Sequence, residues 1–592
     1  MKAIYKLFAL TAALAALAGC DLTMIPEDAV SPESFFHSEV EMQRWLNPLY
    51  ANVLYDGPTS NNYDNFNADD LIDNYLTLIM LGTRSAADAM TGTNLWSWSA
   101  LRRVNLFLQY SSNCEDEAVR SRYEGEARFF RAVIYFHKVC NFGDVPWYDH
   151  VIGSEDTEDL NAPREDRGIV MRHVMDDFDF AIEKLPVTRN LVRVNRWTAL
   201  AFKARAALYE GSWRLYRGLP DAEDYLEIAR DAAKEVLDCG LYSLYTKGET
   251  PYRDLFNADD IDENEVLMAR KYNMEKLSYG NSLQYQWTNA KSGFTKRFMN
   301  QYLMNDGTAF TDREGYETVS FVDEFRDRDP RMAQTVLGPG YIQVGERTVS
   351  ANTLISITGY QPIKYVSDVE HDKTDRGTND WPFMRLPEVM LNYAEARAEL
   401  GELTQEDLDI TVNRIRDRVK MPHLSLEAAN AAPDRYLAEY YSSSLQPSHV
   451  NRGVLLEIRR ERCIELVAEG QRQWDLFRWK EGAHMVNAKD RWYGVYFPGP
   501  GTYDLDGDGV DDVELYETAS SSPVANKKKI GSEIILSGGN SGYIEAYSTS
   551  NYTWDEERDY LYPIPVTQRV LTKGALTQNP GWTDTYEAID GQ

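Results

Sequence analysis

The sequence is poor in the residues that usually build metal centres and redox sites. It has five cysteines and eight histidines among 592 residues. The cysteines form no CxxC pair and show no zinc-ligand spacing, so no zinc or thiol redox motif is recognisable. We expect the last four to be mostly free, buried thiols, and their spacing supports no particular disulfide. These four are Cys114, Cys140, Cys239 and Cys463.

Motifs of the common enzyme classes are also missing. The chain contains no HExxH, no GxSxG, no phosphate-binding P-loop and no GxGxxG in a strand–helix context. A glycosidase needs only two carboxylates, and 93 acidic residues offer too many pairs to single one out. The sequence leaves a hydrolase open but supports none, and we predict a protein that is not an enzyme.

Positive charge is scarce relative to negative charge. The formal net charge is −31. A surface this acidic repels the phosphates of nucleic acids, so we predict no nucleic-acid partner. Hydrophobic residues make up 43% of the chain, which is enough for a sizeable core and too much for a disordered protein.

Long hydrophobic runs are limited to one short stretch near the N-terminus. Residues 7–17 are mostly apolar, follow Lys2 and Lys6, and are too few to span a bilayer comfortably. LAGC at residues 17–20 resembles a lipobox, so we predict a lipoprotein signal peptide at residues 1–19 and lipidation at Cys20. Residues 20–30 would then be a lipid-anchored tether. The alternative is an ordinary signal peptide that happens to precede a cysteine.

What the chain has in abundance is helical periodicity, most clearly in residues 123–147. Apolar residues recur there at steps of three and four along two adjacent stripes, which predicts a helix packed on several sides. Asn141 or Gly143 offers the left-handed residue that ends a helix, and Pro146 prevents its restart.

Further amphipathic segments predict paired helices. Residues 197–211 open with Trp197 and carry small residues, as tetratricopeptide helices do, and residues 225–237 would be their partner. Residues 386–401 and 406–419 make a second predicted pair. Periodicity alone therefore predicts an α-helical repeat scaffold.

A charged helix is predicted at residues 454–479. Arg462, Glu465, Glu469 and Arg472 follow at steps of three and four, which places them on one face. Two carboxylates so spaced can suggest acid–base chemistry. Each has an arginine nearby, however, which lowers its pKa and makes it a poor acid, so we predict a structural ion-pair network.

Several motifs together resemble one family. The sequence GEARFFRAVIYF followed by FGDVPW, LPEVMLNYAEARAELG, the ERxxEL segment, RDPR at residues 328–331, YLYPIP and TQNPGW match the signatures of the SusD/RagB lipoproteins of Bacteroidetes. The resemblance spans residues 17–582. It implies a mainly α fold, a tetratricopeptide-like scaffold of helical pairs with long irregular loop insertions and few short strands.

The resemblance also implies how the chain is divided. Residues 31–592 would form a single SusD-like domain. Its helical repeat core would lie at about 31–245 and 386–480, a loop-rich ligand-binding insertion at about 246–385, and a variable C-terminal region at 481–592. RDPR would be a structural turn.

The function that the resemblance implies is capture of nutrients at the cell surface. The resemblance implies a TonB-dependent, SusC-like outer-membrane transporter as the partner. It also implies an oligo- or polysaccharide as the ligand. The anchor would lie in the outer membrane, although Asp21 after the cysteine favours inner-membrane retention in enterobacteria. Two alternatives stay open: binding of peptides, as in the RagB branch, or a scaffold that only docks a protein partner. No cofactor is required.

Aromatic and polar residues in loops are the candidate sugar ligands. A flat ring packs against the apolar face of a pyranose, while Asn, Asp and Arg bind its hydroxyls. For any single ring, packing in the core is the alternative role. The candidates are Tyr63, Asn67, Asp69, Asp70 and Arg84 from an early loop, and Tyr279, Tyr285 and Trp287 from the insertion.

One segment has the pattern of a calcium-binding loop. Asp504, Asp506, Asp508 and Asp512 occupy positions 1, 3, 5 and 9, and a glycine occupies position 6. Position 12 is Leu515 where a bidentate glutamate is expected. We therefore weigh a structural calcium ion against a solvated acidic turn.

Overall fold

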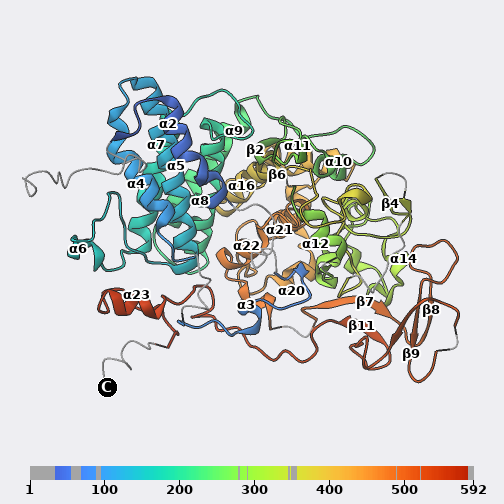
Figure 1. Ribbon diagram of the computed structural model, residues 1–592. Helices are drawn as coiled ribbons and strands as arrows, with labels where there is room; N and C mark the ends of the chain where they lie inside the picture. The colour runs from blue at the N-terminus through green and yellow to red at the C-terminus, as the bar shows by residue number, and fades with distance from the viewer. Residues whose placement is uncertain are drawn as a thin grey trace, which may run out of the picture.

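The computed structural model describes most of the chain and is mainly helical (Figure 1). Its strands are two to five residues long and form only two- and three-stranded sheets within the described ranges. The prediction of a mainly α fold with few short strands is confirmed. The described residues are 34–54, 68–87, 95–277, 280–289, 291–344, 347–348, 356–487, 490–520 and 522–583.

The longest described helix is α5 (Glu117–Phe142), which contains the segment with two apolar stripes. It begins before Tyr123, because Asp116 accepts hydrogen bonds from two backbone N–H groups of the first turn, at 3.0 and 3.1 Å. It ends at Gly143, whose positive φ of 71° with a ψ of −115° is a conformation that glycine adopts readily and other residues rarely do. Both predicted stripes are buried in the larger hydrophobic core.

Long helices pack around α5 in pairs. Helix α5 lies against α7, and α8 lies against α9, as the spacing of residues 197–211 and 225–237 predicted. The α8–α9 approach is close, since a Cβ on Gly211 would lie 2.9 Å from the side chain of Leu226. The helices on this side are α2 (Glu39–Asn52), α4 (Ser99–Tyr110), α7 (Arg167–Lys184), α8 (Arg196–Leu215) and α9 (Ala222–Asp238).

The second predicted pair is only partly correct. Helix α16 (Leu386–Glu399) forms, but it packs mainly against α9 and α21. The expected partner at 406–419 is two short helices, α17 (Gln405–Asp409) and α18 (Val412–Arg418). The break falls at Thr411, whose φ of −125° and ψ of −95° are not helical.

The charged helix predicted at 454–479 is also interrupted. Helix α21 (Arg452–Glu465) and helix α22 (Arg472–Arg478) are separated by a turn in which Ala468 and Gly470 have φ values of 57° and 77°. A right-handed helix cannot continue through positive φ. Arg472 therefore leaves the face of Glu465, and the prediction that all four charged residues share one helical face was wrong.

Many described residues of 246–385 contribute to a second hydrophobic core, which also takes in residues from other parts of the chain. Strands β2 (Val266–Arg270) and β6 (Trp381–Arg385) pair antiparallel, and β1 (Leu71–Ile72) from the early segment pairs with β3 (Gly293–Phe294). The remaining elements are α10 (Pro251–Asn257), α11 (Met274–Leu277), α12 (Leu283–Asn289), α13 (Lys296–Gln301), α14 (Phe321–Glu324), α15 (Pro330–Thr335), β4 (Ile342–Gln343) and β5 (Arg347–Thr348).

The C-terminal region adds strands beside this second core, at the lower right of Figure 1. Strand β9 pairs antiparallel with β8 and parallel with β10, while β7 pairs antiparallel with β11. The bounds are β7 (Tyr493–Phe497), β8 (Gly501–Tyr503), β9 (Val513–Tyr516), β10 (Asn526–Lys529) and β11 (Gly542–Glu545). Short helices elsewhere are α3 (Leu78–Leu81), α6 (Thr157–Leu160), α19 (Leu426–Ala431), α20 (Arg435–Tyr440) and α23 (Val566–Leu571).

The closing motifs fold back onto the end of α5. The backbone N–H of Tyr562 donates to the carbonyl of Asn141 at 2.7 Å. The Asn579 amide donates to the carbonyls of Phe142 and Tyr562, at 3.0 and 2.7 Å. The bonds to Asn141 and Phe142 satisfy carbonyls that the C-terminus of α5 leaves without helical partners.

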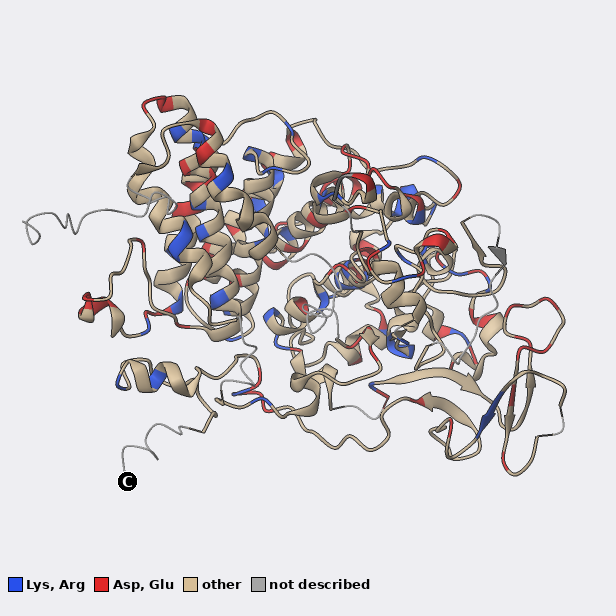
Figure 2. Ribbon diagram, in the orientation of Figure 1, with Lys and Arg blue, Asp and Glu red and all other residues tan. Residues whose placement is uncertain are grey.

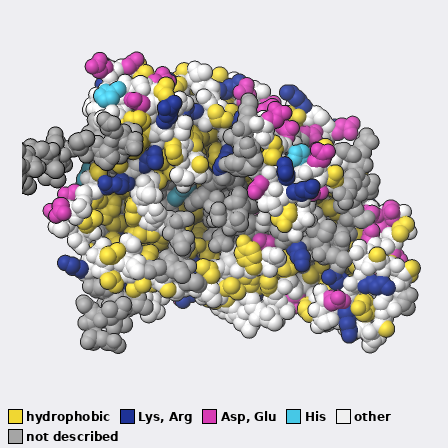
Figure 3. Space-filling view, in the orientation of Figure 1, with side chains coloured by type: hydrophobic (Ala, Val, Ile, Leu, Met, Phe, Trp, Pro, Cys, Tyr) yellow, Lys and Arg dark blue, Asp and Glu magenta, His cyan; other side chains and the backbone are white. Residues whose placement is uncertain are grey.

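Acidic and basic residues are interspersed along the helices on both sides of the molecule (Figure 2). On the face shown in Figure 3, lysine and arginine side chains are scattered rather than gathered into one basic patch. Among the described helices, none combines the length and apolar character needed to cross a membrane. The four cysteines after Cys20 are free, and all but Cys239 are buried.

Candidate functional site

The early-loop candidates are mostly engaged inside the protein. Asp69 is buried and receives two hydrogen bonds of 2.6 Å from Arg472, and the Tyr440 hydroxyl donates to it as well. Burial opposes its ionisation, but the Arg472 guanidinium lowers the pKa of Asp69 below its usual value. Both carboxylate oxygens are occupied, so the prediction that Asp69 binds sugar is not supported. Tyr63 and Asn67 lie outside the described residues.

Asp70 and Arg84 are also internal. Burial, together with the neighbouring Asp69, raises the pKa of Asp70 to about 7. Arg84 forms an ion pair with Asp559 at 3.2 Å, and its guanidinium lies 5.0 and 5.3 Å from the ring centres of Tyr562 and Trp582. These contacts of Arg84 hold the closing segment in place, so Arg84 is structural here, whereas Asp70 is buried and takes no part in them.

The two insertion candidates that the structure describes, Trp287 and Tyr285, are buried and half-buried. Trp287 has no exposed surface and packs in the second core, which leaves no ring face for a sugar. Tyr285 is half-buried on the same short helix, α12, and Tyr279 lies outside the described residues. Leu283 and Trp287 are four residues apart, so both face the core, and that spacing was a sequence signal for the buried role.

A pocket lined by aromatic rings lies between the helical side and the turn before α22. Its cavity volume is about 80 Å³, which is smaller than a cavity that holds one benzene ring. Phe383 and Trp474 are half-buried at its surface, with more deeply buried rings behind them. Its rings are Phe136, Phe202, Tyr209, Trp381, Phe383 and Trp474, from α5, α8, β6 and α22.

The charged residues that line this pocket are all paired. Arg205 holds Glu388 through two bonds of 2.6 Å, and Arg462 holds Asp475 at 3.0 and 3.1 Å. Arg478 binds Asp475 at 2.9 Å and also bonds Glu395. Glu469 accepts bonds of 2.7 and 2.8 Å from Arg385 and one of 2.7 Å from Lys364.

Uncharged polar groups complete the lining. Burial lowers the pKa of His137 to about 3, and Arg205 and Lys138 add to the shift, so the imidazole is neutral at physiological pH. Asn392 is 1% exposed, and its Oδ1 accepts from Arg462 at 2.7 Å. Its Nδ2 has no hydrogen-bond partner within the part of the chain that the structure describes. Gln471 places a second amide at the pocket.

An ion-pair network lies beyond the pocket, around Glu465. Arg418 binds its two oxygens at 2.6 and 2.5 Å, Arg385 binds one at 2.6 Å, and Arg331 of the RDPR motif lies 3.2 Å away. Asp329 caps α15 and also pairs with Arg331. The prediction of a structural network is confirmed, and RDPR is part of it.

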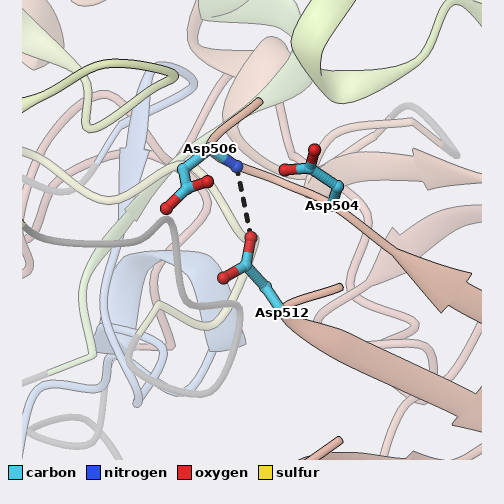
Figure 4. A group of neighbouring side chains, drawn as sticks. All are labelled: Asp504, Asp506 and Asp512. Atoms are coloured by element: carbon cyan, nitrogen blue, oxygen red, sulfur yellow. Dashed lines mark hydrogen bonds between the residues drawn. The ribbon is translucent and has the colours of Figure 1, made fainter. Parts of the chain in front are cut away.

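The predicted calcium loop brings three of its four acids together (Figure 4). Carboxylate oxygens of Asp504, Asp506 and Asp512 lie within 4.8 Å of one another. Asp508 is not in this group, and its carboxylate accepts a bond of 2.7 Å from Val510 N–H. Loop N–H groups also bond to Asp504 at 2.6 and 2.8 Å and to Asp512 at 2.7 and 3.2 Å.

The twelfth position of that loop supplies no ligand. Leu515 is 1% exposed and belongs to the second core. Glu514 beside it accepts a bond of 2.6 Å from Ser520 and lies 3.7 Å from Lys527. A cation here would have three clustered carboxylates and water, fewer protein oxygens than a complete calcium loop provides.

Comparison with known proteins decides the family. The model of the SusD family matches residues 261–582, which is more than half of the chain. The chain belongs to the SusD family. Among curated members it is 26% identical over 505 residues to SusD-like protein P2 of Formosa agariphila, covering 79% of this chain and 89% of that one. It is 23% identical to SusD-like protein P38 of the same organism, covering 82% and 93%.

Solved structures share the SusD fold with this chain. A SusD-like protein of Bacteroides fragilis superposes with a TM-score of 0.67 at 20% identity, covering 94% of this chain and all of that one. A second structure from B. fragilis, described as a SusD-like carbohydrate-binding protein, gives 0.67 at 21% identity, covering 91% and 99%. The family resemblance and the mainly α SusD-like fold predicted from the sequence are thereby confirmed.

The pocket was not predicted from the sequence. Its lining comes from segments that lie far apart, between Leu54 and Arg478. The available signal was the wide apolar circumference of residues 123–147, which required neighbours on several sides. Periodicity identifies such residues as packed but does not say where the packing leaves space.

Proposed function

We propose that this SusD family member is a cell-surface lipoprotein that binds oligo- or polysaccharides and delivers them to a TonB-dependent, SusC-like transporter. The observation that carries the proposal is membership of the SusD family, one of whose solved members from Bacteroides fragilis is described as carbohydrate-binding; half-buried aromatic rings and an amide also meet at the small pocket described above. Rings that pack on sugar C–H faces, beside groups that bind hydroxyls, are what carbohydrate recognition requires. Lipidation at Cys20 would hold the protein at the outer membrane, and residues 31–592 would form the SusD-like domain.

Binding rather than hydrolysis is favoured by the electrostatics of the pocket. Its two carboxylates are Glu469 and Asp475. Burial alone would raise their pKa values, but Arg385 and Lys364 lower the pKa of Glu469, and Arg462 and Arg478 lower that of Asp475. A glycosidase needs one carboxyl group that stays protonated near neutral pH, and neither residue meets that requirement.

Affinity electrophoresis of the mature protein against a panel of polysaccharides tests the proposal. We expect retardation by at least one polysaccharide without release of reducing sugar. Retention by peptides alone would favour the RagB-like alternative, and co-purification with a transporter without any small ligand would favour a scaffold. Replacing Cys20 by alanine should move the protein from the membrane fraction to the soluble fraction.

A further inference from the structure

Glu399, the last residue of α16, is a buried carboxylate whose one ion-pair partner in the described part of the chain is a histidine. Its side chain has no exposed surface, and the Tyr216 hydroxyl donates to its Oε1. Its Oε2 lies 3.3 Å from Nε2 of His449 and has no hydrogen-bond partner among the described residues. An uncompensated buried charge is costly, so the protonation of His449 decides how well this carboxylate is stabilised.

Both ring nitrogens of His449 face oxygens that can only accept hydrogen bonds. Nδ1 lies 2.7 Å from the carbonyl oxygen of Val450, and Nε2 faces the Glu399 carboxylate. A neutral imidazole carries one N–H, so it can donate to only one of these two oxygens. Its other nitrogen then turns a lone pair towards an oxygen. Only the imidazolium, which has an N–H on each nitrogen, suits both neighbours.

The other groups around the imidazole do not take over this role. The His449 ring is stacked on that of Tyr216, with ring centres 6.1 Å apart, and burial raises the pKa of Tyr216 well above its usual 10, so its hydroxyl stays neutral. The contact with Glu399 raises the pKa of His449 above its usual 6.5. Burial of the ring and the positive charge of Arg459 on α21 act in the opposite direction.

The histidine belongs to residues 446–451, which lead into α21. Tyr216 directly follows α8, and Glu399 ends α16. We propose that His449 is a pH-sensitive latch, which fastens residues 446–451 to the ends of α8 and α16 while its ring is protonated and releases them when the ring is neutral. The inference does not depend on the proposed function. A group whose folded pKa is raised stabilises the protein fully below its unfolded pKa and loses that contribution as the pH rises through the folded value. The latch is therefore closed in mild acid and opens in mild alkali.

Protonation of the latch is measured by NMR on the mature protein with ¹³C at the histidine Cε1 positions. The variant His449→Gln identifies the resonance of His449 by its loss. We expect this resonance to titrate above the ordinary value of about 6.5. Glu399→Gln should return the midpoint to about 6.5 or below, because it removes the carboxylate while burial and Arg459 remain. A wild-type midpoint at or below the ordinary value, or one that Glu399→Gln does not lower, would overturn the inference.

Release of the segment is measured by amide hydrogen exchange with mass spectrometry, with rates normalised to the unfolded chain at each pH. The reporting amides are those of His449, bonded to the Gln446 carbonyl at 2.9 Å, and Arg452, bonded to the His449 carbonyl at 3.3 Å. In the wild type we expect their protection to fall at least about tenfold between about pH 5.5 and about pH 8.5, because the pair that holds the segment is lost. His449→Gln should show no such fall.

His150→Gln is the matched control. The His150 ring also lies between two carboxylates, those of Asp149 and Asp159 at 3.1 and 3.0 Å, but its side chain is 52% exposed and belongs to another segment. This variant should keep the wild-type fall in protection at residues 446–452. Equal protection at both pH values in the wild type, or an equal fall in His449→Gln, would show that His449 is not a latch.

Discussion

Replacing Glu465 by glutamine tests whether the buried ion-pair network holds the two cores together. The change keeps the shape of the side chain and removes its charge. Glu465 is fully buried at the end of α21, a helix that contributes residues to both cores, and binds Arg418, Arg385 and Arg331, the last two from the insertion. The variant would remove one carboxylate that three buried guanidinium groups share.

The size of the effect follows from the remaining partners. Arg385 keeps Glu265 and Glu469, and Arg331 keeps Asp329 and Glu461, but Arg418 keeps only Glu265, at 3.2 Å. Removing one member of a buried pair typically costs about 3–5 kcal/mol, and we expect the free energy of unfolding to fall by that amount at pH 7. The control is Asp238→Asn, which breaks the exposed Lys234–Asp238 pair and should cost about 0.5 kcal/mol or less.

Urea unfolding followed by tryptophan fluorescence measures both variants, and its pH dependence adds a second check. Burial opposes ionisation of Glu465, but Arg418, Arg385 and Arg331 lower its pKa well below the ordinary 4.5. A carboxyl group with a lowered folded pKa stabilises the protein above its unfolded pKa and loses that contribution as the pH falls towards the folded value. The difference between wild type and Glu465→Gln should therefore be constant above about pH 5 and shrink in stronger acid. A loss no larger than that of Asp238→Asn would refute the reasoning.

Three further predictions concern separate parts of the molecule. The pKa of Asp70 is raised to about 7, so the folded state favours its protonated form, and this contribution to stability is lost as the pH rises from about 4 to 7. Chemical denaturation should therefore show that Asp70→Asn is more stable than wild type at pH 8, by at most about 4 kcal/mol, and equally stable at pH 3. Calcium should raise the melting temperature of the wild type relative to chelator, Asp504→Asn should abolish the shift and Asp508→Asn should reduce it less, whereas an unchanged wild-type melting curve would identify a solvated acidic turn. Gly453→Ala should destabilise the protein by about 1–3 kcal/mol in the same unfolding assay, because the new Cβ would lie 1.9 Å from the carbonyl oxygen of Ala429, and a stability equal to wild type would show that α19 moves aside freely.

Regular apolar periodicity correctly predicted several of the main helices. Residues 123–147 and the pair at 197–211 and 225–237 formed helices with the expected buried faces, because a 3.6-residue repeat of apolar side chains has few other solutions. The predictions failed where the backbone departs from the repeat. Nothing in the apolar pattern of 454–479 indicates that Ala468 adopts positive φ, although Gly470 beside it was a visible warning.

The candidate ligand residues were harder to predict, because exposure depends on contacts remote in sequence. Asp69 is occupied by Arg472, which lies 403 residues further on, and a single sequence carries no signal for that pairing. Trp287 looked like a loop ring because its helix spans only seven residues. The pocket rings were recognisable only as core residues, since their role depends on a space that several segments leave together.

The return of the closing motifs to α5 has a consequence for how the chain matures. The carbonyl groups at the end of this central helix acquire their hydrogen-bond partners from Tyr562 and Asn579, more than four hundred positions downstream. Synthesis and export proceed from the N-terminus. The carbonyl groups at the end of α5 therefore lack these hydrogen-bond partners until nearly the whole polypeptide has emerged. A chain interrupted before Tyr562 should therefore be recognised by proteases as unfinished, however complete its helical pairs are.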